Sequence, residues 1–200
     1  MPVKIVDKYQ LNINQGVVVV ANHPTLIDVV IIISQLRQCD CIVKSELWRN
    51  PFIRHVIQMA GYIPNESPKI LDICQEKLSS GRKLLVFPEG TRTQPGKKIK
   101  CQRGAAQLAI RCKADIQRIL ITSNPPILYK GVPWYSVPKR KPIIEVKIMA
   151  CESVSSLIEG SRSTPIAARK LTTYLESALE PSNVFEPLNI EEFSVGTFRN

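Results

Sequence analysis

Residues Gly16–Asp28, which read GVVVVANHPTLID, decide the fold that this sequence is expected to adopt. The run Gly16–Ala21 is short and rich in β-branched residues, which is typical of a strand. Pro24 pushes the residue before it towards extended geometry, so His23 is expected at the end of that strand. The apolar run Leu26–Leu36 that follows is consistent with a helix packed against a sheet. Strand, turn and helix in this order predict an α/β unit.

The same alternation of strands and helices continues through the chain. Similar short runs predict further strands at Val3–Val6, Cys41–Lys44, Lys83–Phe87, Ile119–Thr122 and Ile143–Met149. Helices are expected over Pro51–Ala60, Ser67–Ser80, Arg103–Lys113 and Thr164–Leu179, with Ser67-Pro68 and Thr164-Pro165 as capped starts and Gly61 and Gly81 at two ends. The fold class predicted is therefore α/β, with a mixed, largely parallel sheet flanked by helices. Residues 1–180 are expected to form one domain, and residues 181–200 a C-terminal tail.

Composition excludes several classes of protein. The chain has 200 residues, of which 44% are hydrophobic and 22% charged, as in an ordinary globular domain. Its longest uninterrupted apolar stretches are Val17–Ala21 and Val29–Ile33, whereas a membrane-spanning helix needs about 20 largely apolar residues. The start of the chain lacks the pattern of a secretory signal, so the six cysteines are expected to be reduced cytosolic thiols. Their spacing does not suggest a metal site.

The charge of the chain narrows the choice of partner. Lys and Arg number 27 against 17 Asp and Glu, a net charge of +10 that attracts nucleic acid, anionic lipid or a small acidic protein. The positive residues cluster at Lys97, Lys98, Lys100 and Arg103, and again at Lys139–Lys141. Neither cluster is interleaved with aromatic residues as in a groove for single strands, so nucleic acid is not expected as a partner. The alternative interpretation is two solvated loops.

His23 and Asp28 are the first candidates for chemistry. In open α/β sheets, ligands bind where strands end and helices begin, and His23 is expected at such a position. Asp28 lies in the first turn of the next helix, where the chain reversal can bring its carboxylate onto the imidazole and leave the other ring nitrogen free as a base. Alternatively, Thr25–Asp28 is a capping box with Thr25 as the N-cap, and the two roles are compatible. His55 has no acidic neighbour at a useful spacing and is interpreted as structural.

The second candidate is Phe87–Arg92, which reads FPEGTR and follows a predicted strand. As plain structure, Phe87–Gly90 is a type I turn with proline in its second position and glycine in its fourth. A turn does not require the polar side chains of Glu89, Thr91 and Arg92 at the same edge of the sheet. Arg92 offers a planar fork suited to phosphate, and Glu89 can anchor either an acceptor hydroxyl or its own loop.

Asn22–Asp28 followed by Phe87–Arg92 resembles the glycerolipid acyltransferase family, of the lysophosphatidate-acyltransferase type with an HX4D motif. The segment Lys44–Leu47, with Pro51 and Gly61 after it, is similar to that family's second block. Arg103–Ala105 resembles the start of the helix after the third block. The resemblance extends over roughly residues 16–148.

The resemblance implies that residues 1–180 form an acyltransferase domain. Such a domain moves a fatty acyl group from acyl-coenzyme A or an acyl-carrier protein to a hydroxyl of a lysophospholipid or related lyso-lipid, without a bound cofactor or metal. His23 is then the general base and Asp28 its orienter, and direct transfer needs no nucleophilic serine or cysteine. The residues implied for substrate binding are Lys44, Glu89, Gly90, Thr91, Arg92 and Arg103.

Two departures distinguish this chain from the family pattern. Ser67 stands where relatives often have arginine, and Arg118–Leu120 lacks the usual proline. With Pro125-Pro126 and Gly131–Tyr135, the chain resembles acyltransferases of bacterial aryl-polyene and specialised-lipid clusters.

Relatives also carry apolar helices ahead of the histidine block, whereas 22 residues precede His23 here. Either the protein is minimal, or an upstream segment is not part of this sequence. Without such an anchor, the enzyme is expected to be cytoplasmic and peripheral on the inner face of the cytoplasmic membrane. Its basic clusters, with Trp48, Trp134 and Tyr135, are expected to bind the anionic membrane surface. The alternative is that both tryptophans belong to the core.

Two other functions remain open. A non-catalytic basic module would bind anionic lipid or nucleic acid and keep the motifs as turn and cap only. A thioester hydrolase would use the same histidine and aspartate on water.

Overall fold

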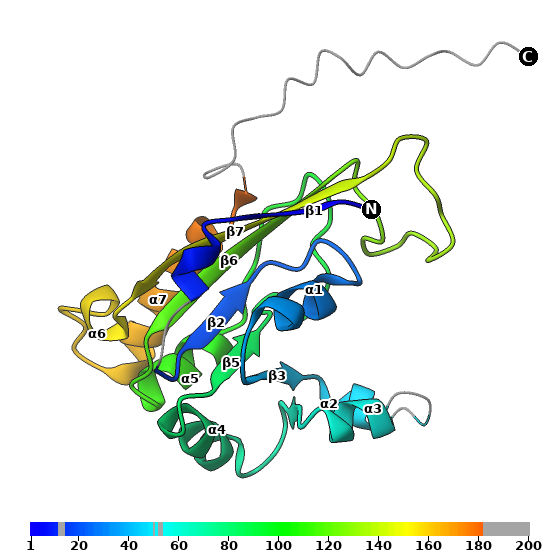
Figure 1. Ribbon diagram of the computed structural model, residues 1–200. Coiled ribbons are helices and arrows are strands. Elements are labelled where there is room, and N and C mark those ends of the chain that lie inside the picture. Colours follow the sequence, from blue (N-terminus) through cyan, green and yellow to red (C-terminus); the bar gives the residue numbers. More distant parts are fainter. Residues whose placement is uncertain (12–14, 50, 52–53, 182–200) are drawn as a thin grey trace, which may run out of the picture.

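The computed structural model describes residues 1–11, 15–49, 51 and 54–181, and within them seven strands form one sheet (Figure 1). The strand order is β1-β7-β6-β2-β5-β3-β4. Neighbouring strands are parallel, except that β6 and β7 are antiparallel. The strands are β1 (Val3–Val6), β2 (Val18–Ala21), β3 (Cys39–Val43), β4 (Ile63–Pro64), β5 (Lys83–Val86), β6 (Ile116–Asn124) and β7 (Ile143–Glu152). The predicted α/β fold with a mixed, largely parallel sheet flanked by helices is confirmed.

Helices cover both faces of the sheet, because the central strands bury side chains on both sides. Val18 and Val20 of β2 pack with α4 (Ile70–Ser79), α5 (Gly104–Arg111), α6 (Val154–Leu157) and α7 (Thr164–Ala178). Val17, Val19 and Ala21 face the other side, where α1 (Asp28–Gln35) and the short η1 (Lys8–Leu11) lie. Two further helices, α2 (Ser45–Arg49) and α3 (Arg54–Met59), lie beyond β3 at one end of the molecule (Figure 1). None of the helices in the described ranges has the length and hydropathy needed to span a bilayer.

The ends of several helices differ from the predictions. The helix predicted from Ser67 begins at Ile70, with Lys69 at the N-cap, because residues 67–70 form a turn closed by the Ile70 N–H and the Ser67 carbonyl (3.0 Å). Ser163, not Thr164, is the N-cap of α7, although proline does lie in its first turn. Gly61 and Gly81 do follow their helices, with φ of +68° and +79°. The predicted tail lies outside the described residues, except for Pro181.

A buried carboxylate ties β3 to the connection between α4 and β5. Asp40 is 1% exposed and accepts hydrogen bonds from Lys77 Nζ (2.9 Å) and from Nε and Nη2 of Arg82. Burial opposes ionisation of Asp40, but the hydrogen bonds and charges of Arg82 and Lys77 outweigh it and lower the pKa of Asp40. All six cysteines are free, and burial raises the pKa of the Cys39 thiol to about 12, so this thiol stays protonated.

Gly16 lies two residues before the central strand β2, at a point of close contact. A Cβ atom on Gly16 would overlap the backbone carbonyl of Leu78 at the end of α4. Glycine therefore lets the chain pass from the helix layer into β2.

Candidate active site

The two motif segments meet at one edge of the sheet, because β2 and β5 are parallel neighbours. Val20 pairs with Val86, so the residues that follow both strands emerge side by side. His23 lies two residues beyond the end of β2, and Phe87 directly follows β5. We refer to Phe87–Thr93 as the 87–93 corner. Strand ends of this kind form ligand sites in open α/β sheets.

His23 and Asp28 form a hydrogen-bonded pair. His23 Nδ1 lies 2.9 Å from Asp28 Oδ2, and the Asp28 side chain is fully buried. An ionised carboxylate only accepts hydrogen bonds, so in this pairing the proton lies on Nδ1 and the lone pair on Nε2. The His23 side chain remains 17% exposed, which leaves it accessible to a substrate. The pair therefore has the arrangement of a base and its orienting carboxylate.

Thr25 holds the Asp28 carboxylate in place. The Thr25 backbone N–H donates to Asp28 Oδ2 (2.7 Å), and the Thr25 hydroxyl donates to Asp28 Oδ1. The hydroxyl also accepts a hydrogen bond from the Ile27 N–H (3.3 Å). The helix itself begins at Asp28 with Ile27 at the N-cap, so the prediction that Thr25 is the N-cap is wrong. The capping interaction of the carboxylate nevertheless coexists with its contact to His23.

The 87–93 corner fixes the backbone of His23. The His23 N–H donates to Glu89 Oε1 (3.0 Å) and Thr93 Oγ1 (3.2 Å), and its carbonyl accepts from the Thr93 N–H (2.7 Å). The Phe87 ring packs against the imidazole, with centroids 4.4 Å apart and planes tilted by 33°. These contacts limit rotation of the His23 ring without covering it completely.

Glu89 acts in the structure as an anchor of its own loop, which is one of the two roles expected for it. Its Oε1 accepts from the Thr93 hydroxyl (2.6 Å) as well as from the His23 N–H. Burial raises the pKa of Glu89, and the hydrogen bonds from Thr93 and His23 partly oppose this. The predicted turn is closed by the Gly90 N–H and the Phe87 carbonyl (3.1 Å), with φ of +63° at Gly90.

Arg92 attaches the corner to the segment that follows β6. Its Nη1 donates to the carbonyls of Leu128 (2.7 Å) and Tyr129 (3.3 Å). A guanidinium carries five N–H donors, and these two bonds involve only its Nη1. Thr91, also expected at the site, is exposed beside Arg92.

Two pockets flank the corner. The first, of about 350 Å³, is lined mainly by apolar residues of β3, α4, β5 and α5, and by Phe87, Gly90 and Lys44. The second, of about 430 Å³, is lined by Thr93–Lys98, by Asn22 and Pro24 on either side of His23, by residues of β6 and of the segment after it, and by Glu180 and Pro181. Of the residues predicted for the site, Lys44 and Gly90 line the first pocket, whereas neither pocket is lined by Asp28, Glu89, Thr91, Arg92 or Arg103. His23 itself lines neither pocket, but Phe87, which packs on its ring, lines the first, and its neighbours Asn22 and Pro24 line the second.

Comparison with known proteins identifies the family of this chain. A sequence model of the Acyltransferase family matches residues 2–123, more than half of the chain. The chain belongs to the Acyltransferase family. It is 32% identical over 114 residues to the 1-acyl-sn-glycerol-3-phosphate acyltransferase of Helicobacter pylori, covering 53% of this chain and 48% of that protein. It is 30% identical over 118 residues to the human 1-acyl-sn-glycerol-3-phosphate acyltransferase alpha, covering 55% and 42%.

The fold of this member of the Acyltransferase family also has a solved counterpart. The crystal structure of the 1-acyl-sn-glycerophosphate acyltransferase from Thermotoga maritima superposes with a TM-score of 0.69 at 23% identity, covering 90% of this chain and 70% of that one. The chain spans about a third to a half of the length of the first curated relatives it matches. None of these comparisons supports the resemblance to the aryl-polyene branch, which stays a prediction.

Several residues of this candidate site were not identified as functional from the sequence. Thr93 closes the corner onto His23, and Phe87 supplies the ring beside the imidazole. Asn22 is fully buried and exchanges two hydrogen bonds with the backbone of Ile121, at 2.8 and 2.7 Å, which extends the pairing of β2 with β6 up to His23. These contacts join residues 64 to 99 positions apart, and no local pattern signals them.

The second histidine lies away from the candidate site. His55 is exposed on α3, with Arg54 Nε 3.5 Å from its Nε2. The interpretation of His55 as a non-catalytic residue is untested, and its position makes it a suitable control for His23.

Proposed function

We propose that this chain transfers a fatty acyl group from an acyl thioester to a hydroxyl of lysophosphatidate or a related lyso-lipid, with His23 as the general base. The observation that carries the proposal is the 2.9 Å contact between His23 Nδ1 and the buried Asp28 carboxylate, next to two pockets. Membership of the Acyltransferase family supports the reaction class. The relatives named above are 1-acyl-sn-glycerol-3-phosphate acyltransferases, which makes lysophosphatidate the first acceptor to test.

The proposed reaction is a direct acyl transfer. His23 Nε2 takes the proton of the acceptor hydroxyl while the hydroxyl oxygen attacks the thioester carbonyl carbon. The tetrahedral intermediate then breaks its C–S bond, and the imidazolium returns the proton to the departing thiolate. The products are an ester and a free thiol, and Asp28 holds Nδ1–H throughout. A positioned base of this kind contributes about 10²–10⁴-fold to the rate.

The two pockets suggest how two substrates reach the same imidazole. The first pocket has an apolar interior and suits the fatty chain of the donor, with Lys44 at its lining. The second is lined by Lys97, Lys98 and the acidic Glu180, whose Oε1 accepts from the Ile99 N–H (2.6 Å). It lies beside the segment that Arg92 binds, so its two lysines suit the phosphate of the acceptor. Because residues in contact with or next to His23 line both pockets, we propose that the hydroxyl and the thioester reach the imidazole from the two sides of the 87–93 corner.

The donor, the location and the finer choice of acceptor are further parts of the proposal. Both acyl-coenzyme A and an acyl-carrier protein supply a thioester, and the enzyme is proposed to work without a bound cofactor. A lyso-lipid of the specialised-lipid type is the second acceptor to test, because of the sequence resemblance around residues 125–135. The proposed location is the inner face of the cytoplasmic membrane, where such substrates lie.

Product analysis tests this proposal. The purified chain is incubated with acyl-coenzyme A or acyl-carrier protein and a panel of lyso-lipids, and the lipids are measured by mass spectrometry. We expect a diacyl product that accumulates in equal amounts with free thiol. Free fatty acid as the sole acyl product would instead show a thioester hydrolase. A folded chain that consumes no thioester with any pair would favour a non-catalytic lipid-binding module.

A further inference from the structure

The segment between β6 and β7 is the most exposed apolar part of the described structure that also carries high positive charge. We call residues 125–142 the β6–β7 loop. Trp134 is 78% exposed, Tyr135 69% and Val137 86%. The alternative that Trp134 belongs to the core is therefore wrong. Figure 1 shows the loop standing out beyond the upper edge of the sheet, away from the helix layers.

The three exposed side chains form a group rather than isolated surface residues. They lie within four positions of one another, and the Trp134 and Tyr135 rings contact edge to face at 5.8 Å. Single exposed apolar residues are common on protein surfaces, whereas a contiguous patch usually marks an interaction site. Tryptophan and tyrosine are enriched at membrane interfaces, because one end of each side chain is apolar and the other polar.

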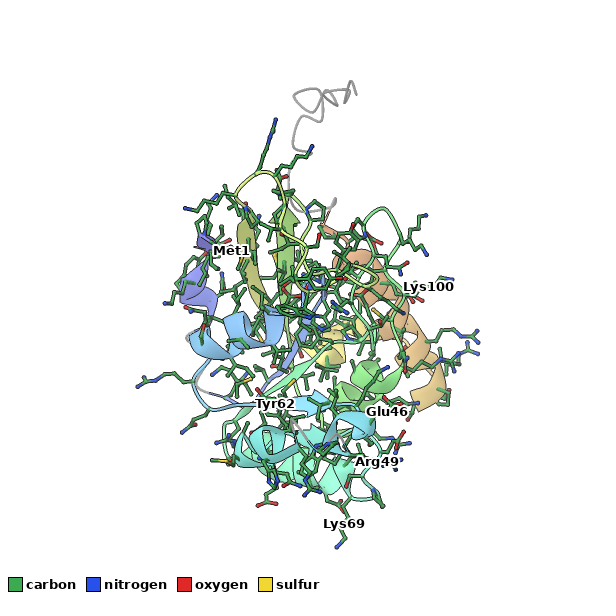
Figure 2. The ribbon with its side chains drawn as sticks, turned by 90° about the vertical axis from the view of Figure 1, so that its right-hand side faces the viewer. Met1, Glu46, Arg49, Tyr62, Lys69 and Lys100 are labelled. Atoms are coloured by element: carbon green, nitrogen blue, oxygen red, sulfur yellow. The ribbon has the colours of Figure 1, made fainter. Side chains whose placement is uncertain are left out.

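The charge of the loop is also of one sign. Residues 125–142 contain no Asp or Glu and four cations, namely Lys130, Lys139, Arg140 and Lys141. The other basic cluster of the sequence lies next to it, because Lys97 and Lys98 line the second pocket together with Tyr129. Lys100 projects outward from the same upper half of the molecule, while Arg49 and Lys69 lie at the lower end (Figure 2). One edge of the protein therefore combines aromatic side chains with a dense positive charge.

We propose that the β6–β7 loop docks onto an anionic lipid bilayer. Trp134, Tyr135 and Val137 enter the headgroup region, and the cations of the loop contact lipid phosphates. The contact turns the edge that carries His23 towards the membrane, since β6 ends at the same edge as β2. Arg92 connects the two regions, because it donates to the carbonyls of Leu128 and Tyr129 at the base of the loop. A lipid bound at the 87–93 corner thus lies close to the bilayer surface.

Helices α2 and α3 offer the competing surface. Met59 on α3 is 89% exposed, and Trp48 lies on α2. Trp48 is only partly exposed, however, and the cation Arg49 on α2 is accompanied by the acidic Glu46. This surface therefore lacks the combination of exposed aromatic rings and uniform charge that the β6–β7 loop has.

The chain contains only two tryptophans, one on each candidate surface, and this allows a direct test. Trp48→Phe leaves Trp134 as the reporter, and Trp134→Phe leaves Trp48. Each variant is titrated with vesicles of phosphatidylcholine and phosphatidylglycerol in a 3:1 ratio, and with phosphatidylcholine alone. We expect Trp134 emission to shift to shorter wavelength and to be quenched by brominated lipid on the anionic vesicles, while Trp48 emission stays unchanged. A response from Trp48 alone, or from neither tryptophan, would overturn the proposal.

Vesicle sedimentation measures the contribution of the side chains. Trp134→Ser with Tyr135→Ser is expected to weaken binding to anionic vesicles at least tenfold, and the control Met59→Ser less than twofold. Lys130→Gln with Lys141→Gln is expected to weaken binding roughly tenfold at low salt. In high salt the variant and the wild-type chain should bind equally, because the charges are then screened. Unchanged binding by the aromatic variant contradicts the proposal.

This inference goes beyond acyl transfer and does not depend on it. The vesicle experiments contain no thioester and no lyso-lipid, so their failure would leave the proposed reaction untouched. Conversely, vesicle binding through the loop by a chain that never acylates any lipid would support the docking surface and refute the enzyme.

Discussion

Replacing Asp28 with asparagine separates the two roles of this carboxylate. Its Oδ2 accepts from His23 Nδ1 and from the Thr25 N–H, and its Oδ1 accepts from the Thr25 hydroxyl. Asparagine can keep all three contacts. Its carbonyl oxygen takes the place of Oδ2 and accepts from His23 and the Thr25 N–H, and its NH2 group takes the place of Oδ1 and donates to the Thr25 hydroxyl oxygen. The substitution therefore removes the negative charge and makes the Thr25 hydroxyl an acceptor in this contact, so that its O–H loses the oxygen to which it donates.

The structure gives the size of the expected effects. In Asp28→Asn the free energy of unfolding should change by about 1 kcal/mol or less, because the hydrogen bonds persist. The value of kcat should fall about 10²–10⁴-fold, because the imidazolium that forms during transfer loses its compensating charge. This corresponds to about 3–5 kcal/mol in the activation barrier. Asp28→Ala should in addition lose about 2–4 kcal/mol of stability, because two buried donors of Thr25 lose their acceptor.

The assay is the initial rate of thiol release at saturating donor and acceptor, with urea denaturation for stability. Asp40→Asn is the matched control, because Asp40 is equally buried but lies at the opposite end of the strands. It should lose stability and keep kcat within about threefold. If Asp28→Asn retains more than half of the wild-type kcat, Asp28 serves only to cap its helix, and the orienting role is refuted.

Three further substitutions test the fold and the corner. Glu89→Gln should keep most of the activity, since an amide oxygen can also accept from Thr93. The pKa of Glu89 is raised in the folded state, so the free energy of unfolding should decline as the pH rises above about 4.5 and Glu89 ionises. Glu89→Gln should remove this decline when unfolding is measured as a function of pH. The pKa of Asp40 is lowered in the folded state, so its ionised form stabilises the native state above the ordinary carboxyl value of 3.8. The free energy of unfolding should therefore fall as the pH drops below 3.8, and Asp40→Asn should make this fall smaller. Gly16→Ala should lower the melting temperature sharply or prevent folding, because its Cβ would overlap the backbone of Leu78.

The alternation of apolar runs and turns was sufficient to predict the fold class. The runs at Val3–Val6 and Lys83–Phe87 are strands within one residue of their predicted limits. Both are short runs of mainly apolar residues, a pattern that can be recognised from the local sequence alone. The strand predicted at Ile119–Thr122 extends to Ile116–Asn124, since pairing with β7 supports residues whose own propensity is weak. The short α2 was missed, because five residues give no helical period.

The functional site could be predicted in part for a similar reason. His23 and Asp28 are close in sequence, so proline geometry and helix spacing were enough to place them together. The contact between Arg92 and Tyr129, and that between Thr93 and His23, depend on which strands are neighbours in the sheet. A single sequence does not specify that order, and these contacts were therefore found only in the structure.

The rate of acyl transfer by His23→Ala is the most direct test of the proposed catalytic base. Wild-type chain, His23→Ala and the control His55→Ala are compared in a single turnover with the acyl thioester and lyso-lipid that give the most product. The His23 variant should form diacyl product at least 100-fold more slowly than the other two, with a melting temperature within a few degrees of wild type. Formation of product by a folded His23→Ala chain at more than half the wild-type rate would contradict the assignment of this histidine.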